Sequence, residues 1–177
     1  MKSNTKYFKP LGPFDINFEN LPGGKRITKD HVTNFWNSKT DLVKIGKGRG
    51  VYIFGMKVTA GVLPCYVGKT KKSFENECFT ARNMITYNGE ILRYERNYKP
   101  FMFFLAYQPQ KKQKISDSVI RELEEYSINL AAQRNPDLAN TRGVKSKERF
   151  SLSDLGGGRG GGAPTKQGTF FKKMMGF

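Results

Sequence analysis

A stretch near the middle of the chain constrains its fold more than any other. From Gly50 to Thr70 the sequence reads GVYIFGMKVTAGVLPCYVGKT. β-Branched and aromatic residues dominate Val51–Met56 and Val62–Val67, and the Thr59–Gly61 region between them is typical of a turn. We therefore predict two short strands joined as a hairpin.

Each predicted strand carries a tyrosine within a short motif. Tyr52 belongs to GVY on the first strand and Tyr66 to YVG on the second. A hairpin of this length can bring both phenols onto one face. Gly68 permits a backbone or a ligand to approach closely, and Lys69 adds a cation at the edge of the same surface.

The charge of the chain indicates a polyanionic partner. Its 177 residues contain 31 Lys and Arg against 15 Asp and Glu, a formal net charge of +16. Such an excess destabilises a compact state unless an anionic partner offsets the repulsion. Aromatic residues make up 13% of the chain and many sit beside charged ones, which favours nucleic acid over a membrane.

Neither a membrane span nor a secretion signal is expected. The sequence has no apolar run near 18 residues, and its N-terminus lacks a hydrophobic segment. Cys65 and Cys78 have flanks typical of a strand and a helix, which predicts buried thiols in a reducing cytoplasm. With His31 as the single histidine, a structural zinc site is not expected.

Composition suggests one central domain with an extension at each end. We predict an N-terminal extension over residues 1–48, loop-rich apart from a short strand over Phe14–Phe18 and a helix from Thr28 or Asp30 to about Asn37. Residues 49–150 form the predicted core. Residues 151–177 comprise a Gly-rich linker and a basic, aromatic tail whose end we expect to be ordered.

Further elements of the core follow from periodicity and turn signals. Residues 73–84 have helical spacing, and Tyr87-Asn88-Gly89 indicates a turn. Residues 100–107 form an almost unbroken apolar run that predicts a buried third strand. Residues 116–134 form the best-defined helix, with Val119, Leu123, Tyr126 and Leu130 on its core-facing side.

Three glutamates on this last helix differ in where their side chains point. With the apolar stripe centred near Leu123, the 100° rotation per residue turns Glu125 toward solvent. Glu122 and Glu124 lie about 100° to either side, on the two borders of the stripe. A metal-binding carboxylate needs such a border position, so both remain candidates.

These motifs together resemble the GIY-YIG nuclease family, with Val in place of Ile in GVY and YVG. The match runs in order from Gly50 through the hairpin, an arginine on a helix and a glutamate on a later helix, to Asn140. The resemblance implies an α+β domain with a small central antiparallel sheet of about three strands flanked by helices. It favours a restriction-endonuclease-like or phage-type member.

The resemblance also implies roles for individual residues. The family's glutamate precedes an isoleucine by four positions, as Glu124 precedes Ile128, which leaves Glu122 as the second choice for the metal ligand. Arg82 is the arginine of the helix after YVG and would hold the scissile phosphate. Asn140 matches the closing asparagine. The implied catalytic set is Tyr52, Tyr66, Lys69, Arg82 and Glu124, and the implied nucleic-acid contacts are Lys69, Arg82 and Asn140.

The expected activity is hydrolysis of DNA phosphodiester bonds with Mg²⁺ (or Mn²⁺). Tyr52 or Tyr66 would take the proton of the attacking water, and Lys69 and the metal could lower the phenol pKa. A structure-selective DNA or RNA nuclease and a non-catalytic nucleic-acid-binding protein are the alternatives. We also predict a homodimer on double-stranded DNA, with apolar residues of the two extensions as interface material: Phe14, Phe18, Val32, Phe35, Trp36, Phe170, Phe171, Met174, Met175 and Phe177.

Overall fold

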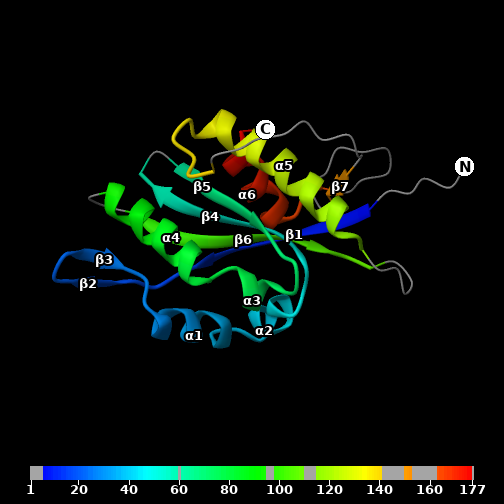
Figure 1. Ribbon diagram of the computed structural model, residues 1–177. Coiled ribbons are helices and arrows are strands. Elements are labelled where there is room, and N and C mark those ends of the chain that lie inside the picture. The colour runs from blue at the N-terminus through cyan, green and yellow to red at the C-terminus, as the bar shows by residue number, and fades with distance from the viewer. Residues whose placement is uncertain are drawn as a thin grey trace, which may run out of the picture.

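A β-sheet with helices on both faces forms the centre of the computed structural model (Figure 1). The structure describes residues 6–59, 61–94, 98–109, 115–140, 150–152 and 163–176, with only the backbone described for Lys6 and residues 150–152. Strand order is β5-β4-β6-β1-β7. The first four strands are antiparallel, and β7 pairs with β1 in parallel over Lys6–Phe8. The fold is therefore α+β.

Seven strands and six helices occur in the described part of the chain. The strands of the main sheet are β1 (Lys6–Asp15), β4 (Gly50–Val58), β5 (Gly61–Lys69), β6 (Lys99–Tyr107) and β7 (Phe150–Leu152), and β2 (Glu19–Leu21) and β3 (Gly24–Arg26) form a separate hairpin. The helices are α1 (Lys29–Asn37), α2 (Thr40–Gly46), α3 (Phe74–Glu77), α4 (Ala81–Arg93), α5 (Asp117–Arg134) and α6 (Lys166–Met175).

Two apolar cores lie on opposite faces of the sheet. Alternation along β4 sends Tyr52 and Phe54 to the core beneath α1–α4, and Val51 and Ile53 to the core beneath α5 and α6. β6 supplies both cores in the same way, which is why its sequence is almost continuously apolar. The hairpin and the third strand of the sequence prediction are confirmed.

The N-terminal segment differs from its prediction, because it contributes a full strand to the main sheet. β1 spans Lys6–Asp15 rather than Phe14–Phe18, so the antiparallel sheet has four strands instead of about three. Pro10 and Pro13 lack an N–H group and are unfavourable inside a sheet. β7 pairs only with Lys6–Phe8. The outer edge of the rest of β1 therefore has no described partner strand that would need an N–H group from either proline.

The single helix predicted over residues 73–84 is two helices, and the predicted turn at Tyr87-Asn88-Gly89 is wrong. Thr80 starts a new helix by accepting a hydrogen bond from the Asn83 backbone, and α4 continues to Arg93. Gly89 is exposed, and a Cβ there would meet no atom within 4 Å. Burial of Tyr87 on the same helix outweighs the low helix propensity of one glycine, about 1 kcal/mol.

Helices α1 and α5 lie where the sequence placed them. α1 covers Lys29–Asn37, and α5 begins after Ser116 and ends before Asn135. The core-facing side of α5 was partly misassigned, because Tyr126 is 39% exposed whereas Ala131 is fully buried. The helix is rotated toward a stripe of Val119, Ile120, Leu123, Ser127, Ile128 and Ala131.

The C-terminal tail ends in α6, as expected for an ordered segment. Phe171, Met174 and Met175 are buried in the core beneath α5 and α6. Phe35 and Trp36 of α1 are buried in the other core, and the remaining described residues named as interface material are partly buried against these cores: Phe14, Phe18, Val32 and Phe170. Phe177 lies outside the described residues. The homodimer stays a prediction.

Both cysteines are buried and unpaired, as predicted. Burial raises the pKa of the Cys65 thiol to about 12. A thiol held protonated in this way is a poor nucleophile. No helix in the described ranges is both long and apolar enough to cross a membrane.

Candidate active site

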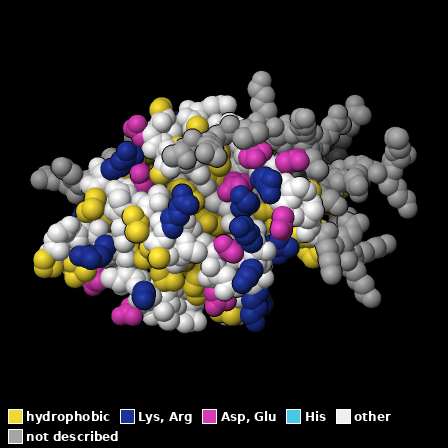
Figure 2. Space-filling view, in the orientation of Figure 1, with side chains coloured by type: hydrophobic (Ala, Val, Ile, Leu, Met, Phe, Trp, Pro, Cys, Tyr) yellow, Lys and Arg dark blue, Asp and Glu magenta, His cyan; other side chains and the backbone are white. Residues whose placement is uncertain are grey.

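A pocket of about 330 Å³ opens where β4 and β5 meet α4 and α5. All five residues of the predicted catalytic set line it: Tyr52, Tyr66, Lys69, Arg82 and Glu124. They come from four separate elements spread over more than 70 positions of the chain. Lys and Arg side chains also gather on the face between α3 and α5, with Asp and Glu among them (Figure 2).

The hairpin places the two tyrosines side by side on one face of the sheet. Tyr52 pairs across the strands with Gly68, and Phe54 pairs with Tyr66. The ring centroids of Tyr52 and Tyr66 are 6.4 Å apart. Gly68 is required by this packing, because a Cβ there would lie 2.4 Å from Cζ of Tyr52. A close approach to Gly68 is present, but the approaching group is the Tyr52 side chain rather than the backbone or ligand that the sequence predicted.

The ends of the GVY…GKT stretch close the hairpin. The Gly50 N–H donates to Oγ1 of buried Thr70 at 2.9 Å, and the Thr70 N–H donates to the Gly50 carbonyl at 2.9 Å. Gly50 has a φ of +153°, and a Cβ would lie 2.0 Å from the Leu105 carbonyl oxygen. These two residues thus fix the strand ends that carry Tyr52 and Lys69.

The Tyr52 hydroxyl is held from two sides. It accepts a hydrogen bond from Nδ2 of Asn83 at 2.8 Å and donates to the Glu77 carbonyl at 3.3 Å. Tyr52 is 3% exposed, and this burial raises its pKa well above the ordinary value, with the charge of Glu124 adding to the rise. Its proton is therefore held in place by the fold.

Tyr66 is more accessible than Tyr52, and its environment has opposing charges. Burial raises the Tyr66 pKa, the Glu124 carboxylate raises it further, and the Arg82 guanidinium lowers it. The expectation that Lys69 would lower a phenol pKa is not met by the protein alone. The Lys69 ammonium instead forms an ion pair with Oε2 of Glu124, and the Glu124 carboxylate offsets its positive charge.

Of the two candidate glutamates, Glu124 is the one that lines the pocket. The Glu124 side chain is 14% exposed and forms an ion pair with Lys69, the last residue of β5. Glu122 lies on the same helix and is not among the pocket residues. Oε2 of Glu122 is buried without a hydrogen-bond partner among the described residues.

Arg82 owes its place to the break between α3 and α4. It is the second residue of α4, exposed at the pocket. The break leaves the Cys78 carbonyl outside helical pairing, and Tyr87 donates to it at 2.9 Å.

Sequence reasoning missed several residues of the pocket wall: Gly68 as a wall residue, and Lys71, Glu77, Thr80 and Asn83. Asn83 is the most informative, since its amide bonds both the Tyr52 hydroxyl and the Glu77 carbonyl. The Thr80-x-x-Asn83 spacing at a helix start was the signal that could have found it. Glu77 adds a second carboxylate to the wall.

Asn140 lies outside the pocket and holds the edge strand β5. Its Oδ1 accepts from the Val67 N–H at 2.8 Å, and its Nδ2 donates to the Val67 carbonyl at 2.7 Å. Upstream, Nδ2 of Asn135 donates to the Pro64 carbonyl at 2.8 Å. Residues 135–140 thereby cover the free edge of β5. This geometry favours a positioning role for Asn140 over the nucleic-acid contact predicted for it.

The donor set fits Mg²⁺ held mainly by water and substrate. Within the described ranges no group of three or more His, Cys, Asp and Glu side chains could hold a metal. Glu124, with Glu77 on the same wall, offers one or two carboxylates. Proteins bind Mg²⁺ through one or two carboxylates together with waters and substrate phosphates, and Mn²⁺ accepts the same ligands.

No protein-family model matches the chain, and neither a curated protein nor a solved structure does. The relation to GIY-YIG nucleases therefore rests on the motifs quoted above and stays a prediction.

Proposed function

We propose that the protein is a Mg²⁺-dependent (or Mn²⁺-dependent) endonuclease that hydrolyses phosphodiester bonds of double-stranded DNA, as a restriction-type enzyme. One observation carries the proposal. The family resemblance implies a catalytic set of Tyr52, Tyr66, Lys69, Arg82 and Glu124, and all five line one pocket. A net charge of +16 adds support for a polyanionic substrate.

The residues divide into those that contact substrate and those that position them. Arg82 is exposed at the pocket and would bind the scissile phosphate, where its charge stabilises the transition state. Glu124 would hold the ion, which supplies charge stabilisation at a phosphate oxygen. Lys69 would then be released from Glu124 to face the phosphate.

Of the two tyrosines, Tyr66 suits the role of general base better. The Tyr52 hydroxyl already donates to the Glu77 carbonyl and accepts from Asn83. Tyr66 is only partly buried; burial and the Glu124 charge raise its pKa, and the Arg82 guanidinium opposes that rise. Tyr52 is then a positioning residue that packs against Gly68 and orients Asn83.

The test is cleavage of plasmid DNA and of structured RNA by the full chain, with Mg²⁺ and with a chelator. We expect cleavage of DNA with Mg²⁺ only. Glu124→Gln should abolish it and leave DNA binding nearly intact, because one charge at the ion site is lost while every basic contact remains. Glu122→Gln, the same change on the same helix outside the pocket, is the matched control and should cut at the wild-type rate.

Three results would contradict the proposal. Cleavage by Glu124→Gln at the wild-type rate would exclude its role. Cleavage of RNA alone would make the chain an RNA nuclease. Salt-dependent DNA binding by the wild-type chain without cleavage under any divalent cation would make it a non-catalytic binding protein.

A further inference from the structure

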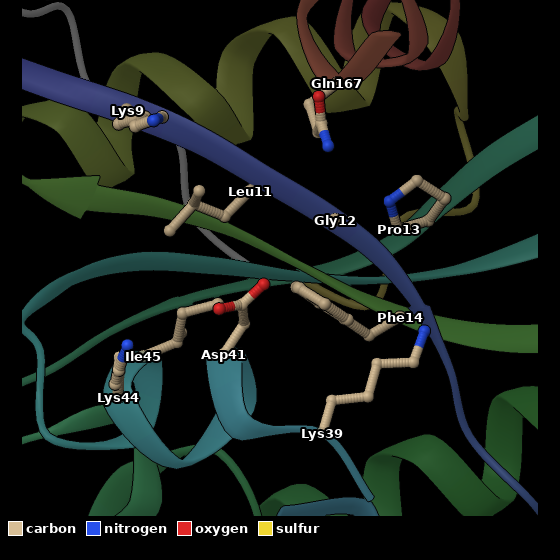
Figure 3. A pocket seen from close by; sticks show the side chains of 10 residues that line it. All are labelled: Lys9, Leu11, Gly12, Pro13, Phe14, Lys39, Asp41, Lys44, Ile45 and Gln167. Atoms are coloured by element: carbon tan, nitrogen blue, oxygen red, sulfur yellow. The ribbon is translucent and has the colours of Figure 1, made fainter.

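A second hollow, about 410 Å³ in volume, lies at the β1 side of the sheet (Figure 3). Its walls are β1, the short helix α2 and the first turn of α6. It shares no residue with the candidate active site. We refer to it as the lysine pocket, after Lys9, Lys39 and Lys44 in its wall.

Positive charge prevails in the lysine pocket. Three lysines and a single acidic residue, Asp41, line it, and Figure 3 shows the lysine side chains spread along its wall. Among the described residues no ion pair joins any of the three lysines to an acidic group. All three side chains are exposed, so their charges are available to a ligand.

The fold orients parts of this wall before any ligand binds. Nζ of Lys39 lies 5.9 Å from the ring centroid of Phe14, a cation–π contact that holds the side chain beside β1. Figure 3 shows the Gln167 side chain reaching down from α6 toward β1, on the other side of that strand from Asp41. An amide at this position can donate a hydrogen bond to an oxygen of an anionic ligand.

The lysine pocket is remote from the active site across the sheet. Tyr66, Gly68 and Lys69 belong to β5, and β4 and β6 separate that strand from β1. With neighbouring strands about 4.8 Å apart, the two strands are about 14 Å apart. One phosphate cannot occupy both sites.

We propose that the lysine pocket is a second, non-catalytic site that binds the phosphate groups of a nucleic-acid strand. Lysine is a point charge suited to phosphate, and contacts to phosphate carry no sequence information. Binding there is therefore independent of sequence. The protein would hold either a nucleic-acid strand that bends around the β-sheet or a second segment of the same nucleic-acid molecule.

The test compares two triple variants by fluorescence anisotropy with a labelled duplex. Lys9→Gln, Lys39→Gln and Lys44→Gln together remove the charges of the pocket. Lys29→Gln, Lys99→Gln and Lys173→Gln remove the same charge from exposed positions that line neither site. A duplex of about 40 base pairs is titrated between about 50 and 200 mM salt. Circular dichroism melting checks that both variants are folded.

Loss of the pocket charges should reduce the slope of log affinity against log salt by about 2 to 3, because each lost phosphate contact accounts for about 0.9. The control variant should change it by less than about 1. Equal slopes in the two variants would overturn the inference. So would lysine-dependent binding of tripolyphosphate with unchanged DNA affinity, because the ligand would then be a small polyphosphate.

This binding measurement does not depend on catalysis. If the two triple variants differ in slope but the wild-type chain never cleaves, only the proposed nuclease function is contradicted. A chain that cleaves through Glu124 while the two triple variants bind alike would contradict the lysine pocket alone.

Discussion

Substitution of Gly68 by alanine probes the geometry on which the candidate site depends. The new Cβ would lie 2.4 Å from Cζ and 2.5 Å from the hydroxyl oxygen of Tyr52. Real Cβ atoms do not approach other heavy atoms this closely, so the ring must move. Tyr52 is 3% exposed and is packed on Tyr66, which leaves it little free space.

The expected destabilisation follows from these contacts. Overpacking a buried site costs about 1–3 kcal/mol. Movement of the phenol also weakens the bonds from Asn83 and to the Glu77 carbonyl, each contributing about 1 kcal/mol net. Together we expect Gly68→Ala to lower the free energy of unfolding by about 2–4 kcal/mol.

Urea unfolding of the full chain measures this change. Gly89→Ala is the matched control, since it is the same substitution on a helix where the Cβ would meet nothing within 4 Å. That variant should gain up to about 1 kcal/mol from helix propensity. In a Tyr52→Leu background the cost of Gly68→Ala should fall below about 1 kcal/mol, because the clashing atoms are gone. Wild-type stability of Gly68→Ala would refute the packing of Tyr52 on Gly68.

Two further predictions concern stability. Asn140→Ala removes both bonds to the Val67 backbone and should cost about 2 kcal/mol in urea unfolding; a loss of DNA affinity at unchanged stability would instead indicate a nucleic-acid contact. Burial raises the Tyr87 pKa well above its ordinary value, so the folded chain keeps a proton that the unfolded chain loses above about pH 10. Stability should therefore fall with rising pH there, by about 1.4 kcal/mol per pH unit for this group. Tyr87→Phe should reduce the measured slope by about this amount, and an unchanged slope would count against the buried phenol.

Local patterns in the sequence were sufficient for the centre of the fold. The hairpin, the third strand and α5 have long apolar or periodic runs with clear turn and capping residues at their ends. β1 could not be predicted in this way, because its prolines oppose a strand in a sheet interior. The pairing of β1 in the sheet shows why Pro10 and Pro13 are tolerated: β7 pairs with β1 only over Lys6–Phe8.

The misread segment between Phe74 and Arg93 has a different cause. Gly89 and Asn88 favour a turn locally, but Asn88 bonds both backbone groups of Ile27, at 2.8 Å for the N–H and 3.2 Å for the carbonyl. A contact across 61 positions thus overrides the local preference. The same limit applies to the site. Tyr52, Tyr66 and Glu124 follow from motif and periodicity, whereas the Lys69–Glu124 ion pair depends on how α5 meets β5.

The residues around the pocket separate into a framework and an accessible set. Asn83, Tyr87 and Asn140 direct their polar atoms to the protein itself, mostly to backbone carbonyls and N–H groups. Arg82 has an exposed side chain, and the bond of the Glu124 carboxylate within the described part of the chain is to another side chain, Lys69. Changes in the framework should therefore appear first as lost stability, and changes in the accessible set as lost cleavage in a stable chain. If the pocket served only folding, variants at both sets of positions would lose stability. The pattern across variants therefore distinguishes an active site from a cluster that only stabilises the fold.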